Sequence, residues 1–269
     1  MRIKIIQKLI DILRGKRFFN FVGKNNKIII PDKCKFNLIK LFVFSRIKIK
    51  GDNNTIIFRG NFSKTNFLNI RKELTIYIYG DNNIIDIEFP IRFQNVLIGM
   101  EEAHNIFKIR KTSYSIRDAR IFIEEGGTVL IGENSELKNR GLHIVVNNGY
   151  KKKPKLIIGD NVHIAKDAII RASDGHTLVD VVTGKALNEP EDIIIGDNVW
   201  ITSRCTILKG SCIPSNSIVG ACSLVNKKFT EENVIIAGLP AKIIKRNIKW
   251  DNRTYGTYMK NFEANNVKK

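Results

Sequence analysis

Residues 193–225 read IIIGDNVWITSRCTILKGSCIPSNSIVGACSLV, and this stretch decides the fold. An aliphatic residue returns every six positions, and a second column of mostly small residues lies four positions after it. The first column is Ile195, Ile201, Ile207, Ile213, Val219 and Val225, and the second is Val199, Cys205, Ser211, Ser217 and Ser223. A helix repeats near 3.6 residues and a simple strand at about two, so this period indicates a solenoid. Three such sides close a triangular coil of about 18 residues that stacks on the next coil.

The same period continues upstream with two interruptions. The step from Ile131 to Ile158, two further members of the aliphatic column, exceeds one coil by nine residues. The step from Ile158 to Ile195 exceeds one coil by 19 residues. We therefore expect a short loop around residues 147–155 and a long projecting loop over residues 176–194. A long loop on a regular scaffold is a favoured place for function.

The regular repeat covers residues 113–246, and three other segments surround it. Residues 1–20 are basic and amphipathic, which predicts a cap on the open end of the solenoid, with membrane-surface binding as the alternative. Residues 21–112 contain the echoes GKNNKIII, GDNNTIIF and GDNNIIDI, each a Gly/Asn turn before a β-branched run. This pattern predicts irregular β coils that continue the solenoid. Residues 247–269 form a basic tail to which we assign no chemistry.

The composition limits the classes of partner. The formal net charge is +19, which raises nucleic-acid binding as a possibility, but the sequence lacks a helix-turn-helix, a zinc finger and an aromatic RNA-binding signature. We therefore expect no nucleic-acid partner. Lys, Asn and Ile are abundant throughout the chain, so we interpret the positive charge mainly as a result of overall composition. The alternative is that the charge favours binding to polyanions, such as CoA phosphates, acidic polysaccharide or anionic lipid headgroups. No secretory signal is visible in the sequence, so we expect a cytoplasmic location. The four cysteines agree with this expectation, because they form no C-x-x-C pair and are expected to be reduced thiols.

Two motifs resemble a known family. Residues 193–245 look like the hexapeptide-repeat acyltransferases, and SDGHTL (173–178) resembles the catalytic-histidine motif of the branch that O-acetylates capsular and lipopolysaccharide sugars. The resemblance is strong over residues 126–245 and weak before Ser113. It implies an all-β fold, namely a left-handed parallel β-helix with a projecting loop and short helical or irregular ends. The left hand comes from the resemblance alone, since most parallel β crossovers are right-handed.

The resemblance also implies an acetyl-CoA-dependent O-acetyltransferase that acts on a capsular or lipopolysaccharide sugar. His176 matches the family's general base, and histidine suits this task because it titrates near neutral pH. The sugar hydroxyl would attack the thioester directly. Asp174 would orient the imidazole or contact the sugar, unless it only forms the turn before Gly175. Trp200 matches a tryptophan that lines the family's catalytic tunnel, with packing against a neighbouring subunit as the alternative.

Stacked coils place equivalent residues above one another, so Glu136, His163 and Trp200 are expected to form a ladder. His163 is thus a rival base to His176. We interpret His163 instead as an acceptor-binding or packing residue.

Two segments, IVGACSLVNKK (218–228) and AGLPAK (237–242), resemble the family's CoA-binding segments. Gly220 and Ala221 would leave room for the pantetheine arm, which would meet backbone near Ser203 and Ala221. Four lysines would meet the phosphates, although any one of them could equally be solvated: Lys227, Lys228, Lys242 and Lys245. Asn226 stands where family members often carry threonine.

The resemblance implies a homotrimer with active sites between subunits and a carbohydrate acceptor. A further option is peripheral contact with the inner membrane or with polysaccharide-assembly machinery. We expect no metal, because His143, His163 and His176 lack the close pairing of zinc ligands. Two alternatives stay open. One is N-acetylation of an amino sugar or nucleotide-sugar, and the other is a non-catalytic glycan-binding solenoid.

Overall fold

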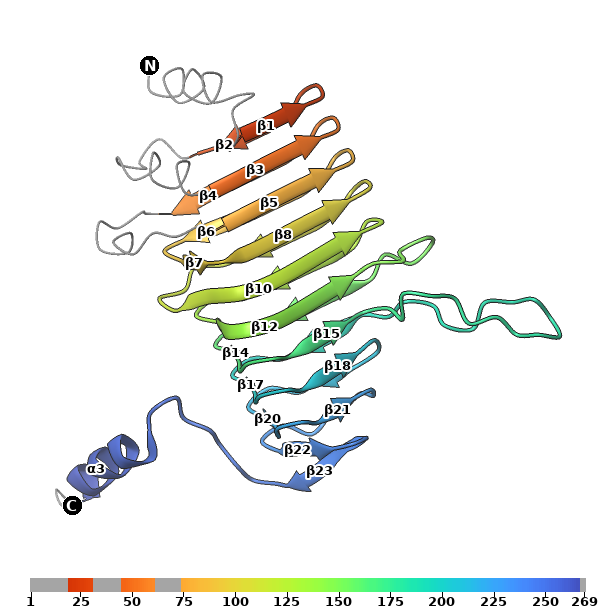
Figure 1. Cartoon of the computed structure of the whole chain (residues 1–269). Helices are drawn as coiled ribbons and strands as arrows, with labels where there is room; N and C mark the ends of the chain where they lie inside the picture. The colour runs from red at the N-terminus through yellow and green to blue at the C-terminus, as the bar shows by residue number, and fades with distance from the viewer. Residues whose placement is uncertain (1–18, 31–44, 61–73, 267–269) are drawn as a thin grey trace.

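The computed structural model describes residues 19–30, 45–60 and 74–266. In these ranges the chain winds into a parallel β-helix, a stack of coils in which strands pair with their equivalents in the next coil (Figure 1). The cap expected over residues 1–20 lies almost wholly outside the described ranges. Those ranges contain no helix that is long and apolar enough to cross a membrane.

Two parallel sheets build the first half of the stack. The first sheet contains β1 (Phe19–Val22), β3 (Ser45–Lys50), β5 (Leu74–Tyr79), β8 (Val96–Glu101), β10 (Ser115–Glu124) and β12 (Glu136–Val146), and the short β7 (Arg92–Gln94) pairs with β10. The second sheet contains β2 (Lys27–Ile29), β4 (Thr55–Gly60), β6 (Ile84–Phe89), β9 (Ile106–Ile109), β11 (Thr128–Ile131), β13 (Lys155–Ile158), β16 (Ile193–Ile195) and β19 (Cys212–Ile213). Residues 21–112 therefore belong to the same stack as the regular repeat.

The first sheet divides at β12, and from there the coils have three faces. The start of β12 pairs with β14 (His163–Ile164) and its end pairs with β15 (Ile169–Arg171). Face one holds β14, β17 (Trp200–Ile201), β20 (Ile218–Val219) and β22 (Ile235–Gly238), with the antiparallel β23 (Ala241–Lys245) at its end. Face two holds β15, β18 (Thr206–Leu208) and β21 (Leu224–Val225), and face three holds β13, β16 and β19. This triangular cross-section is the one that the period of six predicts.

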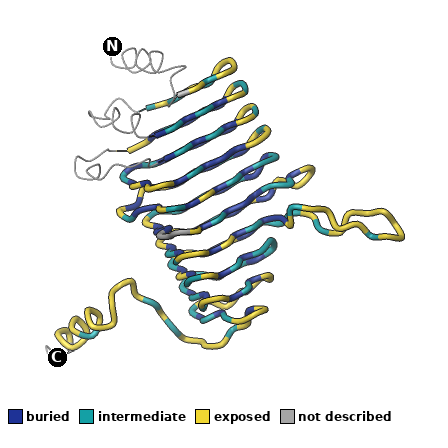
Figure 2. Tube along the Cα trace, viewed as in Figure 1, coloured by how far each residue is buried: buried dark blue, intermediate teal, exposed yellow. Residues whose placement is uncertain are grey.

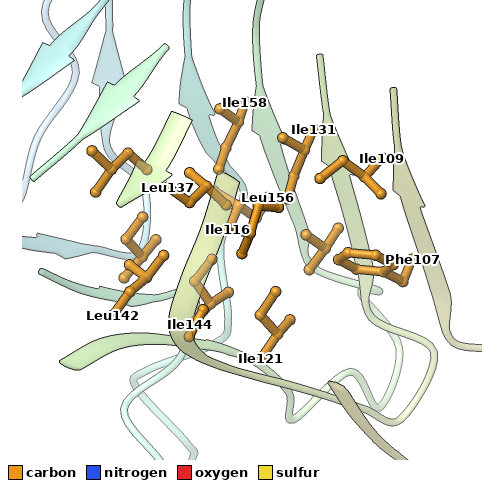
Figure 3. Close-up of a cluster of buried hydrophobic side chains, with 14 of the residues drawn as sticks. Phe107, Ile109, Ile116, Ile121, Ile131, Leu137, Leu142, Ile144, Leu156 and Ile158 are labelled. Carbon is orange, nitrogen blue, oxygen red and sulfur yellow. The ribbon is translucent and has the colours of Figure 1, made fainter. Parts of the chain in front are cut away.

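Aliphatic side chains fill the interior of the stack from β3 onward. Figure 2 shows where buried residues lie along the coils, and Figure 3 shows one cluster of the buried side chains. Every named member of the two predicted columns is at most 2% exposed, so both columns are confirmed as inward-facing. The buried serines hydrogen-bond to the backbone: Ser211 Oγ donates to the Val225 carbonyl at 3.0 Å, and Ser223 Oγ accepts from Gly238 N at 3.0 Å. Small residues fit this column because it lies at a corner of the coil.

A ladder of asparagines explains the echoes in residues 21–112. Asn54 and Asn83, the fourth residues of two echoes, are fully buried. Each donates its Nδ2 to the Oδ1 of the asparagine one coil earlier, Asn26 or Asn54, at 3.0 Å. The glycine that begins each of these echoes packs so closely on the next coil that a Cβ on Gly51 would overlap the Gly80 carbonyl. The echoes are therefore structural coil corners.

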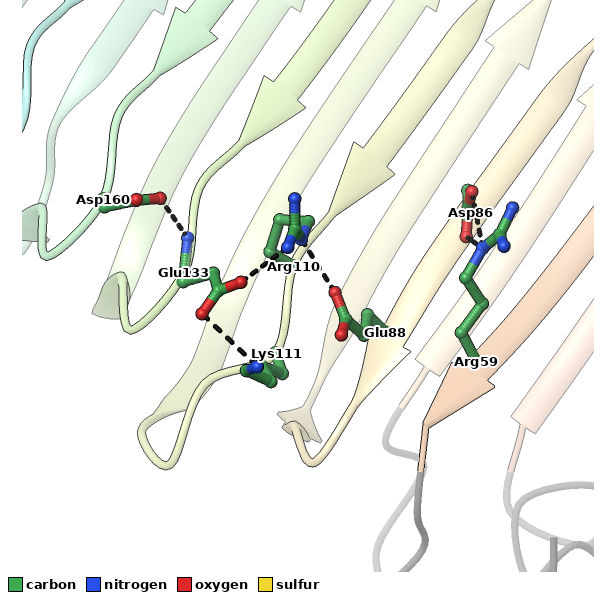
Figure 4. Close-up of polar contacts among 7 residues, drawn as sticks. All are labelled: Arg59, Asp86, Glu88, Arg110, Lys111, Glu133 and Asp160. Atoms are coloured by element: carbon green, nitrogen blue, oxygen red, sulfur yellow. Dashed lines mark hydrogen bonds and ion pairs between the residues drawn. The ribbon is translucent and has the colours of Figure 1, made fainter. Parts of the chain in front are cut away.

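Ion pairs also join coils on the outer surface of the second sheet (Figure 4). Arg59 Nε lies 2.8 Å from Asp86 Oδ1, and Arg110 lies between Glu88 and Glu133. Both arginine side chains are more than half exposed, so solvent screens the pairs. The backbone ladder and the apolar interior therefore hold the coils together.

Two loops leave the stack close to the predicted places. The segment between β12 and β13 spans residues 147–154, one residue fewer than expected. The long arm between β15 and β16 spans residues 172–192 and not 176–194, because residues 193–195 form β16 and because Ala172 and Ser173 are already part of the turn. The arm is a narrow hairpin that projects far from the stack (Figure 1).

The inward column gives a matched test on β16. Ile195 is 1% exposed, and its neighbour Ile194 is 45% exposed. We expect Ile195→Ala to destabilise the protein by about 2–5 kcal/mol, because it leaves a cavity between coils. Ile194→Ala should change the stability by about 0.5 kcal/mol or less. Thermal unfolding followed by circular dichroism measures both, and equal losses in the two variants would contradict the assigned face.

Candidate active site

His176 lies at the neck of the long arm, where the chain leaves the corner between faces two and three. Gly175 has a φ of +85°, a left-handed conformation that glycine adopts readily, and it turns the chain outward just before His176. The His176 side chain is exposed. A base for an external substrate must be accessible, and His176 meets this requirement.

Asn188 spans the neck from the returning strand of the arm. Its Nδ2 donates to the His176 carbonyl at 2.8 Å and to Asp174 Oδ2 at 2.8 Å. Its Oδ1 accepts from Leu178 N at 2.7 Å. The side chain of Asn188 thus bonds to the outgoing strand on both sides of His176, and nothing in the sequence pattern pointed to it.

Asp174 is bound from the coil that follows. Lys209, directly after β18, places its Nζ 2.6 Å from Asp174 Oδ2 and donates to the Glu189 carbonyl at 3.1 Å. The hydrogen bond from Lys209 is the main reason why the pKa of Asp174 is lowered, and the bond from Asn188 adds to it, while partial burial opposes both. Asp174 therefore holds the neck of the arm, and its carboxylate bonds to Lys209 and Asn188. Direct orientation of the imidazole by Asp174, one of the expected roles, has no contact to support it here.

A cavity of about 340 Å³ opens beside His176. The 147–154 loop lines it with Tyr150, Lys151 and Lys152, and the arm lines it with His176 and Asn188. The loop is held against the arm because Ser173 Oγ donates to Asn147 Oδ1. The cavity therefore combines an imidazole, two ammonium groups and one aromatic ring with one carboxylate residue, Glu189. The two lysines outnumber the single acidic residue, which suits a sugar that carries a negative charge.

The expected ladder of Glu136, His163 and Trp200 is confirmed on face one. The strands pair Glu136 with His163 and His163 with Trp200 in register. The His163 Nδ1 lies 3.3 Å from Glu136 Oε2, and the ring packs edge-on against Tyr114 at 5.0 Å. His163 is thus enclosed by other side chains, which favours packing or acceptor binding over the role of base.

The C-terminal tail reaches this ladder, although we assigned it no chemistry. The Trp250 ring centroid lies 5.0 Å from that of His163 and 6.1 Å from that of Trp200. Its Nε1 donates to the Asn198 carbonyl at 2.5 Å. A cavity of about 390 Å³ remains under the tail, lined in part by Tyr114, His163 and Trp250. Beyond it the chain forms α3 (Tyr255–Asn266), which stands away from the stack (Figure 1).

The residues predicted to bind CoA occupy two places. Ser203 and Ala221 lie at the corner between faces one and two, where the Ser203 carbonyl accepts from Cys222 N at 3.0 Å. Gly220 lies at the same corner, and a Cβ there would come within 2.8 Å of the Ala237 Cβ, so close stacking of coils already requires a glycine. The lysines are all exposed; Lys227 and Lys228 follow β21, and Lys242 and Lys245 lie on β23.

Within one chain the predicted catalytic residues do not come together. His176 and Asp174 share the arm's neck, between faces two and three. Trp200 lies on face one and packs against Trp250. His143 does not face inward, because the buried Leu142 and Ile144 flank it on β12. Within the described ranges, no cluster of three His, Cys, Asp or Glu side chains could hold a metal ion.

Comparison with known proteins places the chain. No family model matches it. It is 32% identical over 215 residues to the polysialic acid O-acetyltransferase of Neisseria meningitidis, which covers 78% of this chain and 91% of that protein. It is 35% identical over 130 residues to the polysialic acid O-acetyltransferase of Escherichia coli O1:K1, covering 48% of this chain and 40% of that protein.

A solved structure agrees with this assignment. The polySia-specific acetyltransferase NeuO superposes with a TM-score of 0.69 at 28% identity, over 84% of this chain and 99% of that one. The predicted left-handed parallel β-helix is therefore confirmed. The chain belongs to the hexapeptide-repeat acyltransferases, in the branch that contains the polysialic acid O-acetyltransferases, and it is an O-acetyltransferase.

Proposed function

We propose that this enzyme transfers an acetyl group from acetyl-CoA to a hydroxyl group of an acidic capsular sugar, with His176 as the general base. The polysialic acid O-acetyltransferases among its relatives support a capsular acceptor. The observation that carries the proposal is the cavity at the arm's neck, where exposed His176 adjoins Lys151 and Lys152. The two ammonium groups suit the carboxylate of an acidic sugar.

The transfer needs only one proton carrier. The imidazole of His176 removes the proton from the sugar hydroxyl as its oxygen attacks the thioester carbonyl carbon. The tetrahedral intermediate then collapses, the carbon–sulfur bond breaks, and the CoA sulfur takes the proton from the imidazolium. The acetyl ester and free CoA are the products. No enzyme nucleophile takes part, because the enzyme holds the two substrates in contact.

Acetyl-CoA would lie along the corner between faces one and two. There Ala221 is exposed and the next residue, Cys222, donates its N–H to the Ser203 carbonyl, and a slender pantetheine chain would bond to backbone groups at this corner. The phosphates would meet lysines at the end of the stack, on β23 or after β21.

The active site would be shared between the subunits of a homotrimer. On one chain, His176 and Trp200 occupy different parts of the coil, so a site that uses both residues draws them from two chains. The arm supports this arrangement, because five of its aliphatic side chains are more than half exposed: Leu178, Val179, Val181, Val182 and Leu187. A neighbouring subunit would cover this apolar surface.

We expect the activity to depend on the proposed base. CoA release from acetyl-CoA, measured by thiol titration, should depend on an acidic capsular polysaccharide and should fall by about 10²–10⁴-fold in kcat for His176→Ala. His163→Ala is the control, and it should mainly raise the KM for the acceptor. Loss of turnover in His163→Ala with turnover retained in His176→Ala would reverse the two roles. Absence of CoA release with every acceptor, together with absence of CoA binding, would favour the glycan-binding alternative.

We expect acceptor binding to depend on the two lysines of the cavity. Lys151→Gln/Lys152→Gln should raise the KM for an acidic polysaccharide, because two charges that face it are removed, and should leave the KM for acetyl-CoA unchanged. Added salt should raise the wild-type acceptor KM and affect the variant less. The matched control is Lys27→Gln/Lys108→Gln, which removes two exposed charges from β2 and β9, in earlier coils that do not line the cavity. Equal effects of the two pairs would point to overall charge alone.

A further inference from the structure

We infer that Asn188 and Lys209 are positioning residues that clamp the neck of the arm and so hold His176 in place for the transfer. This inference rests on the proposed role of His176 and extends it to two residues outside the SDGHTL motif. Asn188 also lines the cavity proposed for the acceptor, whereas Lys209 does not. Both act through hydrogen bonds to the segment that carries His176.

The backbone of the arm does not fix His176 by itself. Backbone hydrogen bonds between the two strands lie on both sides of His176. Glu191 N donates to the Ala172 carbonyl at 3.1 Å on the side of the stack, and Leu187 N donates to the Leu178 carbonyl at 2.8 Å on the outer side. In the described ranges His176 takes part in no backbone-to-backbone hydrogen bond. The Asn188 side chain replaces the missing rung, because it binds the His176 carbonyl with Nδ2 and Leu178 N with Oδ1.

Lys209 connects this rung to the rigid stack. It follows β18, whose Ile207 is fully buried and in register with Ile170 of β15. Its Nζ binds Asp174 on the outgoing strand and the Glu189 carbonyl on the returning strand. The Lys209 side chain is only 18% exposed, so its position is well defined. Asp174 Oδ2 also receives Asn188 Nδ2, which joins the two residues into one clamp.

The chemistry explains why an exposed histidine needs such a clamp. A base must lie within about 3 Å of the proton that it removes, and a displacement of about 1 Å can reduce the rate by about 10²-fold. His176 is exposed on a projecting arm, so packing contributes little to its placement. Hydrogen bonds at the neck are therefore the contacts that fix the position of the His176 backbone, from which the imidazole extends.

The test compares the clamp with the tip of the same arm. Asn188→Ala and Lys209→Met should each lower kcat by about 10–100-fold and change the KM for acetyl-CoA by less than about twofold. In a His176→Ala background the same changes should cause no further loss, because they act through His176. Lys209→Arg should restore most of the activity. The control is Asp180→Ala, which removes the turn contacts of Asp180 to Val182 N and Thr183 N at the tip and should leave kcat unchanged.

A second measurement reads the position of His176 without turnover. The chain contains four histidines, so ¹³Cε1-labelled histidine gives a spectrum in which His176→Ala identifies one signal. We expect Asn188→Ala to shift or broaden this signal while the other three stay in place, and Asp180→Ala to leave all four unchanged. An unchanged His176 signal in both clamp variants, with kcat within about twofold of wild type, would overturn the inference. If His176→Ala retains full turnover, the proposed base is wrong, and the signal alone still decides whether the clamp holds.

Discussion

The structure depends on the in-register pairing of each coil with the next. Parallel strands of successive coils align residue by residue, as Ile170 with Ile207 and Ile207 with Val225 on face two. Each side chain therefore meets its own equivalent one coil away, and a residue type that suits one coil suits all of them. Where that type is polar, as for Asn54 and Asn83, the repetition itself supplies the hydrogen-bond partner. An insertion has to leave at a corner, because a longer side would break this alignment.

This constraint explains which features could be predicted from the sequence. The period of six follows from the geometry of a coil side, so it identified the inward columns and the ladder of Glu136, His163 and Trp200. Two steps of the aliphatic column are longer than one coil, and these two extra lengths located both loops to within a few residues. The earlier coils were harder to recognise, because their strands of six residues, such as β3 and β5, alternate in burial and do not repeat at six. Their asparagine corners were visible only as three echoes.

The residues that hold the candidate site in place could not be predicted from the sequence, for a different reason. Lys209 is 35 positions from Asp174, and Trp250 is 52 positions from the carbonyl that its indole binds. No periodicity links such partners, because one of them always lies outside the repeat, in the arm or in the tail. The SDGHTL motif identified His176 through resemblance, but it carried no information on what holds the arm. Contacts between a regular scaffold and an irregular insertion are set by three-dimensional packing alone.

The same geometry bears on how many chains a complete site requires. Ser203 and Lys209 lie at opposite ends of the side that contains β18, six positions apart, which corresponds to about 20 Å of extended chain. The neck of the arm is tied to Lys209, whereas the corner proposed for the pantetheine chain is at Ser203. Proton transfer requires contact at about 3 Å. If the thioester lies at the Ser203 corner, as proposed, the arm of a second chain is the natural source of the base. The clamp that holds His176 is therefore compatible with the proposed sharing of the site between subunits.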